Sequence, residues 1–310
     1  MKLLYLSLLS FVFIASTTLA IYRLSIPTVT VKASVNKVEM GSANLVPIPV
    51  LIKDKTFPVV SAQSALIIDV DSGMSLYEKN PEGILFPAST TKILTALISL
   101  EHYPLDSTLT VGIFAVDGQK MGLKAGEIIT VRDLLYGLLV YSANDAAEVL
   151  AQNYCSGTTC GRAEFIRVMN EKASILKLTQ SNFENPSGLD DPRHITSAKD
   201  LARLAAVAMR NPFFRQMVAT QKTTVKSVDG TVVHKLTNLN ELLGKVEGVM
   251  GVKTGWTENA RENLVTYVER KNRKIMLVVL GSQDRFGETE ELINWAFDSY
   301  VWREVQEPAL

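Results

Sequence analysis

The order of strand-type and helix-type segments most constrains the fold of this chain. Residues 65–70 and 74–77 flank Asp71-Ser72-Gly73, a pattern typical of a β-hairpin. Residues 130–214 show helical spacing, and strand-type segments return after Thr220. Because strands lie at both ends and helices between them, we predict an α/β (α+β) fold, with one antiparallel sheet covered by helices plus an all-helical lobe. A cleft between the lobes is the expected position of a binding site.

The expected elements can be given by residue range. A first helix begins at Pro87-Ala88-Ser89 and runs to about Leu100. The other expected helices span residues 131–141, 143–154, 162–176, 197–210 and 288–302. The expected later strands span residues 223–228, 231–235, 248–254, 263–269 and 274–281.

The N-terminus carries a separate signal. Leu3–Tyr22 is almost entirely apolar and lies between Lys2 and Arg23. It fits either a secretory signal peptide or an uncleaved membrane anchor, since about 20 apolar residues cross a bilayer. Both interpretations export the rest of the chain, and we favour the anchor. We therefore expect a signal peptide or anchor over residues 1–23, an extended linker over 24–57 and one folded domain over 58–305.

Charge and cysteine content narrow the possible functions. Lys plus Arg and Asp plus Glu each number 32, and this balance argues against a nucleic-acid partner. Cys155 and Cys160 are the only cysteines, and in an exported protein this close pair predicts a disulfide. The chain has no HExxH motif or histidine cluster, so we expect no metal in catalysis.

Three short motifs follow one another along the chain. They are Ser89-Thr90-Thr91-Lys92 (S-x-x-K), Ser142-Ala143-Asn144 (S-x-N) and Lys253-Thr254-Gly255 (K-T-G). Together they indicate a serine acyl-transfer site in which lysine moves protons. Ser89 and Lys92 lie one turn apart at the start of an apolar helix, so the amine can reach the hydroxyl. Burial of that helix is expected to lower the pKa of the lysine.

Two of these motifs recur elsewhere in the chain. S-x-x-K is repeated at Ser34–Lys37 and Ser174–Lys177, and S-x-N at Ser34–Asn36 and Ser42–Asn44. The copies within residues 34–44 lie in the expected linker, and Ser174–Lys177 falls at a helix end, so neither context aligns the side chains for catalysis. Lys253-Thr254-Gly255 has no second copy.

Each motif also has a purely structural interpretation. Ser142 or Asn144 could cap the helix that follows, and Lys253 could be a solvated lysine on an edge strand. In the functional interpretation, Gly255 lets the substrate lie close to that strand. The occurrence of all three motifs in order favours the functional interpretation.

Longer stretches around the motifs resemble serine-type D-Ala-D-Ala carboxypeptidases, the low-molecular-weight penicillin-binding proteins of the β-lactamase/transpeptidase-like superfamily. The resemblance covers about residues 61–300. It implies an exported enzyme without a cofactor that removes the terminal D-alanine from peptidoglycan stem peptides and is acylated by β-lactams. The stretches that carry it are Asp71–Gly73, Leu76–Asn80, Phe86–Lys92, Ser142–Ala147, Asn185–Leu189, His194 and Gly251–Thr257.

The resemblance also implies a role for each site residue. Ser89 is the expected nucleophile, Lys92 its base and Ser142 the relay of a proton to the leaving D-alanine. Asn144 is expected to bind the peptide backbone of the substrate, and Lys253 and Thr254 its terminal carboxylate. Gly255 is expected to bind substrate at the strand edge. The backbone N–H groups of Trp256 and Ser89 are expected to form an oxyanion hole.

Some positions depart from the family pattern or leave the activity open. Relatives often carry a small Ala-Gly pair at the position where this chain has Ala260-Arg261-Glu262-Asn263. We expect the larger side chains of this stretch to alter the choice of substrate. His194 is expected to be structural.

A β-lactamase would need a deacylating glutamate, but Glu184 lacks the Glu-x-x-x-Asn pattern and is expected at the surface. The sequence is also compatible with a D,D-endopeptidase that cleaves cross-links, and with a non-enzymatic penicillin-sensing or wall-binding module.

Overall fold

A computed structural model of the 310-residue chain describes residues 46–52 and 56–304. These residues belong to one compact unit, Leu45–Leu310. The predicted signal or anchor segment, residues 1–23, lies outside the described part, as does most of the predicted linker. No helix within the described ranges is long and apolar enough to span a membrane.

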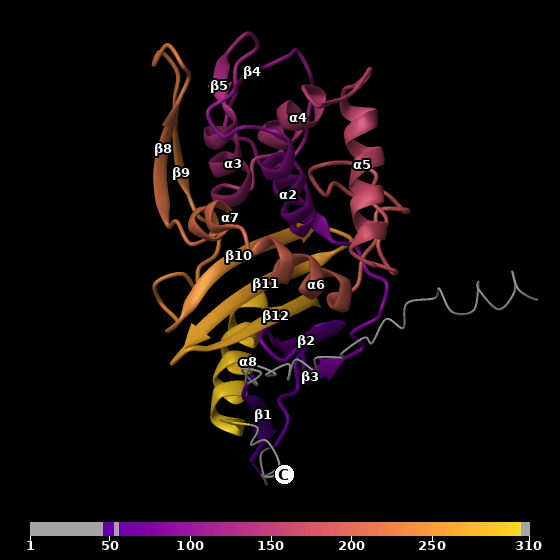
Figure 1. Ribbon diagram of the computed structural model, residues 1–310, viewed down its shortest axis with the longest axis vertical. Coiled ribbons are helices and arrows are strands. Elements are labelled where there is room, and N and C mark those ends of the chain that lie inside the picture. The colour runs from indigo at the N-terminus through magenta and orange to yellow at the C-terminus, as the bar shows by residue number, and fades with distance from the viewer. Residues whose placement is uncertain (1–45, 53–55, 305–310) are drawn as a thin grey trace, which may run out of the picture. The chain divides into compact units, whose positions relative to one another are not determined.

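A five-stranded antiparallel sheet forms the centre of the fold, with strand order β10-β11-β12-β2-β3 (Figure 1). The sheet joins the early hairpin to the late strands, as the sequence predicted. Its central pairing places Leu277 of β12 opposite Ile67 of β2. The strands are β2 (Ser64–Asp69), β3 (Ser75–Lys79), β10 (Val249–Thr257), β11 (Arg261–Arg270) and β12 (Arg273–Ser282).

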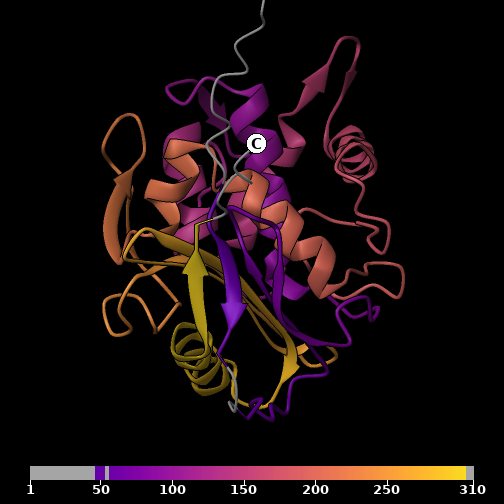
Figure 2. The same cartoon turned by 60° about the horizontal axis from the view of Figure 1, so that its bottom comes forward.

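Helices cover both faces of this sheet. Along β12, Met276 and Val278 face one hydrophobic core and Ile275 and Leu277 face the other, because alternate side chains of a strand point to opposite faces. The first core includes α2 and α6, and the second includes α8, which Figures 1 and 2 show on the far side of the sheet. The helices are α2 (Lys92–His102), α3 (Val131–Val140), α4 (Asn144–Gln152), α5 (Arg162–Ile175), α6 (Ala198–Ala208), α7 (Pro212–Val218) and α8 (Arg285–Ser299).

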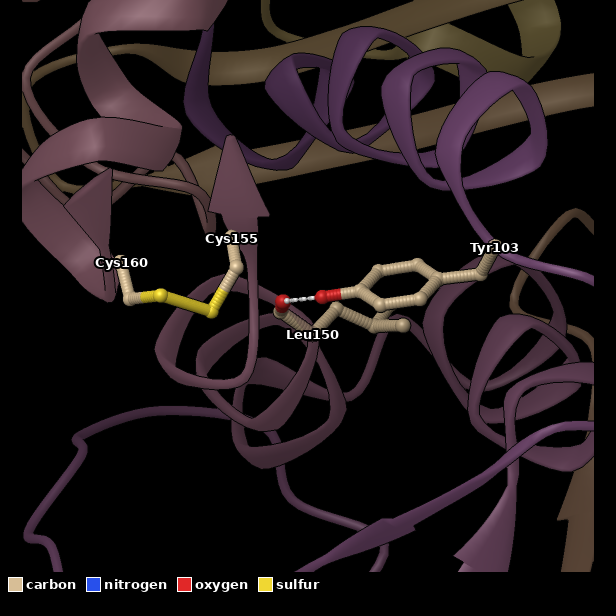
Figure 3. The surroundings of a disulfide bond; sticks show 4 residues. All are labelled: Tyr103, Leu150, Cys155 and Cys160. Atoms are coloured by element: carbon tan, nitrogen blue, oxygen red, sulfur yellow. Dashed lines mark hydrogen bonds between the residues drawn. A yellow bond between two sulfur atoms is a disulfide. The ribbon is translucent and has the colours of Figure 1, made fainter. Parts of the chain in front are cut away.

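Four two-stranded sheets complete the described fold. Strands β4 and β5 are joined by a long connection, residues 111–127, which we call the cleft loop. Another of these sheets is closed by a disulfide between Cys155 and Cys160, next to a hydrogen bond of 3.0 Å from the Tyr103 hydroxyl to the Leu150 carbonyl oxygen (Figure 3). The pairs are β1 (Ile48–Leu51) with β13 (Tyr300–Arg303), β4 (Thr108–Thr110) with β5 (Ile128–Thr130), β6 (Cys155–Ser156) with β7 (Thr159–Cys160), and β8 (Lys222–Lys226) with β9 (Val233–Thr237).

The ends of the domain differ from the sequence-based expectation. Residues 48–51, expected within the linker, form β1 and pair with β13, so the folded domain begins before residue 58. The expected helix over 288–302 starts at Arg285, ends at Ser299 and continues as that strand. A tertiary contact helps to hold this strand in place, because Trp302 on β13 donates a hydrogen bond from Nε1 to the Asp69 carboxylate at 2.8 Å. Helix α7, which begins with Pro212, was not predicted.

Candidate active site

Ser89 lies where a short turn meets a buried helix. A 3-10 turn spans Ala88–Thr91, and α2 begins at Lys92. Ala88 has a φ of 47°, a left-handed conformation that is unfavourable for alanine and is retained only where the surroundings impose it. The turn leaves Ser89 partly exposed, and Ser89 lines a cleft of the described domain.

Asn263 on β11 holds the segment that precedes Ser89. Its Nδ2 donates to the carbonyl oxygens of Phe86 at 2.9 Å and Pro87 at 3.0 Å, and the residue is fully buried. Arg261, two residues earlier, is exposed. The unusual stretch after the third motif therefore supplies a positioning contact for Ser89. Its expected effect on substrate choice stays a prediction.

Lys92 has the geometry of a base for Ser89. Its Nζ lies 2.9 Å from Ser89 Oγ, 2.6 Å from Asn144 Oδ1 and 2.6 Å from the Ser187 carbonyl oxygen. The last two atoms can only accept hydrogen bonds. A neutral amine has two N–H bonds and one lone pair, so donation to these two oxygens leaves the lone pair directed at the Ser89 hydroxyl.

Burial favours this neutral form of Lys92. The residue has no exposed surface, and burial together with the positive charge of Lys253 holds its pKa well below the ordinary value. Burial and the nearby Arg285 lower the pKa of Lys253 to about 7. The surroundings of the site therefore favour the neutral form of both lysines.

Ser142 and Asn144 lie at the link between α3 and α4. Ser142 has a φ of 60°, and its Oγ accepts a hydrogen bond of 2.8 Å from Lys253 Nζ. The N-cap of α4 is Ala143, which caps without a side chain, so the interpretation of this motif as a helix cap is wrong. Asn144 bridges Lys92 and the cleft loop, because its Nδ2 donates to the Asp117 carbonyl oxygen at 2.7 Å.

The competing interpretations of Lys253 and of the repeated motif also fail. Lys253 is only 2% exposed, so it is not a solvated edge lysine. At Ser174–Lys177 the helix α5 ends at Ile175, and Lys177 is exposed with a φ of 55°. These two side chains therefore do not share one helical face. The other copies, within residues 34–44, lie outside the described part of the chain.

All three motifs meet at one cleft of about 850 Å³. Ser89 and Ser142 lie on its wall, as does Trp256, which is 62% exposed. Lys92 and Lys253 are buried immediately behind this wall. The residues that line it are Ser89, Asp117, Gly118, Gln119, Ser142, Asn144, Ser187, Gly188, Leu189, Asp190, Leu239, Thr254, Gly255, Trp256, Thr257, Glu258 and Arg285.

Gly255 packs closely against the Ser89 segment. A Cβ at this position would lie 3.1 Å from the Pro87 carbonyl oxygen and 3.2 Å from both Ala88 Cβ and the Ser89 nitrogen. The absence of a side chain lets β10 pack against the Ser89 segment. Gly255 also lines the cleft, and the expectation that it lets the substrate lie close to the strand stays a prediction.

Arg285, at the start of α8, belongs to the cleft although the sequence analysis missed it. Its Nη1 donates to the Gly255 carbonyl oxygen at 3.0 Å, and its backbone N–H donates to Glu262 Oε2 at 2.9 Å. The buried Nε has no hydrogen-bond partner among the described residues. An arginine 32 residues after Lys253 carries no recognisable motif, so only the fold could identify it.

His194 and Glu184 lie outside the lining of the cleft. His194 is 1% exposed, its Nε2 lies 2.8 Å from Thr91 Oγ1, and burial lowers its pKa to about 4. Its role is therefore structural, as predicted. Glu184 pairs with Arg193 at 3.1 Å. Within the described ranges, no group of three or more His, Cys, Asp or Glu side chains could hold a metal ion.

Comparisons with known proteins agree with this geometry. A family model described as D-alanyl-D-alanine carboxypeptidase matches residues 52–284, and the chain therefore belongs to this family of serine-type peptidases. The D-alanyl-D-alanine carboxypeptidase DacF of Bacillus subtilis is 31% identical over 249 residues, which are 77% of this chain and 63% of that protein. The chain thus spans less than two thirds of this relative.

Two further similarities cover more of the compared protein. The D-alanyl-D-alanine carboxypeptidase DacB2 of Mycobacterium tuberculosis is 32% identical over 246 residues, 76% of this chain and 82% of that protein. Among solved structures, the Streptomyces K15 DD-transpeptidase is 31% identical with a TM-score of 0.74, covering 79% of this chain and all of that one. The fold is therefore that of the penicillin-binding DD-peptidases, as the sequence resemblance implied.

Proposed function

We propose that this protein is a penicillin-sensitive serine D-Ala-D-Ala carboxypeptidase that shortens peptidoglycan stem peptides outside the cytoplasmic membrane. The observation that carries the proposal is the placement of Lys92 Nζ, 2.9 Å from Ser89 Oγ and bound to two further oxygens that can only accept. Family membership supports the substrate class.

Acylation uses the neutral Lys92 amine. Ser89 Oγ attacks the carbonyl carbon between the two terminal D-alanines while its proton passes to the Lys92 lone pair. The N–H groups of Ser89 and Trp256 stabilise the negative oxygen that forms. Collapse of this intermediate breaks the C–N bond and leaves the shortened peptide as an ester on Ser89.

The leaving D-alanine needs a proton and a site for its carboxylate. Ser142 accepts a hydrogen bond from Lys253, so its hydroxyl can pass a proton to the leaving amine and regain one from the lysine. Lys253, Thr254 and Arg285 provide positive charge and donors for the carboxylate.

Before the second step, exchange with solvent removes the proton that Lys92 took from Ser89 and returns one to Lys253. A water molecule then attacks the ester while its proton passes to the neutral Lys92 amine. The bond from the acyl carbon to Ser89 Oγ breaks, Lys92 returns the proton to Oγ, and the shortened peptide leaves as an acid.

The full chain should be incubated with a pentapeptide ending in D-Ala-D-Ala, with a cross-linked peptide dimer, and with the pentapeptide plus an amine acceptor. We expect free D-alanine from the pentapeptide, and no release by Ser89→Ala. Cleavage of the dimer alone would reassign the protein as an endopeptidase. Product joined to the amine in place of hydrolysis would indicate a transpeptidase.

Penicillin separates a carboxypeptidase from a β-lactamase and from a sensor. A labelled penicillin is expected to acylate Ser89 and to be released slowly, because the ester occupies the water-binding side of the site. Rapid turnover would indicate a β-lactamase. Stable labelling without cleavage of any peptide would indicate a sensor.

The pH dependence of acylation should report both lysines. The rate is expected to rise as Lys92 deprotonates, because only the neutral amine accepts the serine proton. As pH rises through about 7, Lys253 loses the charge that holds the substrate carboxylate. The ratio of kcat/KM between a carboxylate substrate and its C-terminal amide should therefore fall across this range. A constant ratio would contradict the role of Lys253.

A further inference from the structure

Leu239 presents an apolar side chain to the cleft, and the proposed mechanism does not use it. The residue lies two positions after the end of β9, lines the cleft and is 36% exposed. Among the described residues that line this cleft, the only other large apolar side chains are Leu189 and Trp256. An apolar side chain in the wall of a cleft contributes to ligand binding through the shape of the space that it leaves.

The residues on both sides of Leu239 are bound firmly to the protein. Asn238 Nδ2 donates to the carbonyl oxygens of Val218 at 3.2 Å and Thr220 at 2.9 Å, at the end of α7. Asn240 is buried, and its backbone N–H donates to Asn238 Oδ1 at 2.9 Å. We call residues 238–241 the Leu239 loop. Because this loop is braced, its leucine can limit what fits beside it in the cleft.

The Leu239 loop runs past the part of the cleft where the leaving residue is expected. The Leu239 N–H donates to the Val140 carbonyl oxygen at 3.3 Å, two residues before Ser142. At the other end of the loop, the Glu241 carboxylate attracts the Arg285 guanidinium electrostatically. In the proposed mechanism, Ser142 protonates the leaving amine and Arg285 contributes to the carboxylate site. The loop therefore connects the surroundings of the two groups that hold the leaving residue.

The leaving residue has one substituent that neither group holds. Its amine faces Ser142 and its carboxylate faces Thr254 and Arg285, which leaves the side chain on its α-carbon. In D-alanine this side chain is a methyl group. In a cross-linked peptide, the leaving residue continues into a second peptide. A leucine on a braced loop can pack against a methyl group, but a longer chain would have to displace it.

We propose that Leu239 is a specificity-determining residue that closes the leaving-residue side of the cleft, so that the site accepts a terminal D-alanine in preference to a residue joined to a second peptide. This proposal rests on the proposed function. It supplies a structural reason for the removal of terminal residues over the cleavage of cross-links.

Leu189 provides a matched control in the same cleft. A Cβ added to Gly118 would lie 4.0 Å from Leu189 Cδ2 and 2.8 Å from Asn144 Nδ2. Leu189 therefore lies beside the residue that is expected to bind the peptide backbone, away from the leaving residue. Leu189→Ala removes the same side chain as Leu239→Ala, but from the acyl side of the expected scissile bond.

Two peptides with the same acyl part test the proposal. One ends in D-Ala-D-Ala. The other ends in D-Ala followed by Nε-acetyl-D-lysine, which keeps the carboxylate and the D configuration and lengthens only the leaving side chain. Release of the terminal residue by the full chain in detergent gives kcat/KM for each peptide. We expect the unmodified protein to prefer the D-Ala-D-Ala peptide at least about tenfold, the discrimination typical of an apolar contact with the substrate.

Leu239→Ala should change the two rates in opposite directions. The kcat/KM for the D-Ala-D-Ala peptide should fall about fourfold, because the methyl group of the leaving residue loses a buried contact. That for the acetyl-lysine peptide should rise, so that the preference falls at least about tenfold. Leu189→Ala should leave the preference unchanged within about a factor of two, and Leu239→Met should keep most of it, since methionine fills a similar volume.

The possible outcomes separate this proposal from the proposed function. An equal fall of both rates in Leu239→Ala, or the same loss of preference in Leu189→Ala, would overturn the role of Leu239. So would an unmodified protein that cleaves both peptides at similar rates. In each of these cases, release that disappears in Ser89→Ala still supports the peptidase. Absence of release from both peptides would instead reject the proposed function, and the role of Leu239 with it.

Discussion

Lys92→Met is expected to lower the rate of Ser89 acylation by about a thousandfold, the effect of removing a general base. Methionine fills a similar volume but has neither a lone pair basic enough to take the serine proton nor donors for Asn144 and Ser187. The rate should be measured with a labelled penicillin under single-turnover conditions. Thermal unfolding should be recorded in parallel, because two buried oxygens lose their partner.

The chain contains its own control for this experiment. Lys177→Met changes the lysine of the second S-x-x-K copy, which is exposed and lies beyond the end of α5. We expect an acylation rate unchanged within about a factor of two, as for most surface substitutions. If both variants lost activity equally, or if Lys92→Met kept most of it, Lys92 would not be the base.

Gly188→Ala is expected to reduce acylation at least about a hundredfold and to destabilise the fold by about 3 kcal/mol. Gly188 has a φ of 86°, and a Cβ there would lie 1.8 Å from the Ala88 carbonyl oxygen. This is a backbone atom of the turn that carries Ser89, so the clash cannot be relieved by rotating a side chain. The turn itself must move.

Gly73→Ala separates this clash from the cost of a left-handed alanine. Gly73 has a φ of 73°, and nothing lies within 4 Å of its added Cβ. We expect a loss of about 1 kcal/mol from backbone strain and no change in acylation. Chemical denaturation gives the free energy of unfolding of each variant, and penicillin labelling gives the rate. Similar effects of the two substitutions would contradict the close packing of Gly188 against the Ser89 turn.

Most of the fold followed from local pattern. The sheet strands and four helices of the middle lie within a few residues of their predicted positions, because alternation and helical spacing are properties of short segments. The predictions failed where a distant partner decides the structure. β1 forms because β13 is there to pair with it, and α8 ends at Ser299 because the next residues join that pairing. Neither segment contains this information alone.

The site shows the same division. The three motifs identified Ser89, Lys92, Ser142, Asn144 and Lys253 from residue types and spacing, and the fold brings them to one cleft. Their purely structural interpretations could be rejected only from burial and contacts.

Other site features had no sequence signal. Asn263 holds the Ser89 segment through the Phe86 carbonyl oxygen, 177 positions away in the chain. Arg285 reaches the cleft from the start of the last helix. Leu239 reaches the cleft from the loop that follows β9.

The sequence by itself determined the class of chemistry and the class of fold, since both depend on residue types at short spacing. Only the tertiary structure decided which lysine is buried beside a serine, why Gly188 must be glycine, what Gly255 packs against and how the cleft loop is held. These features depend on the low polarity of the interior and on contacts between residues far apart in the chain. Such contacts exist only once the sheet and the helical lobe have packed together.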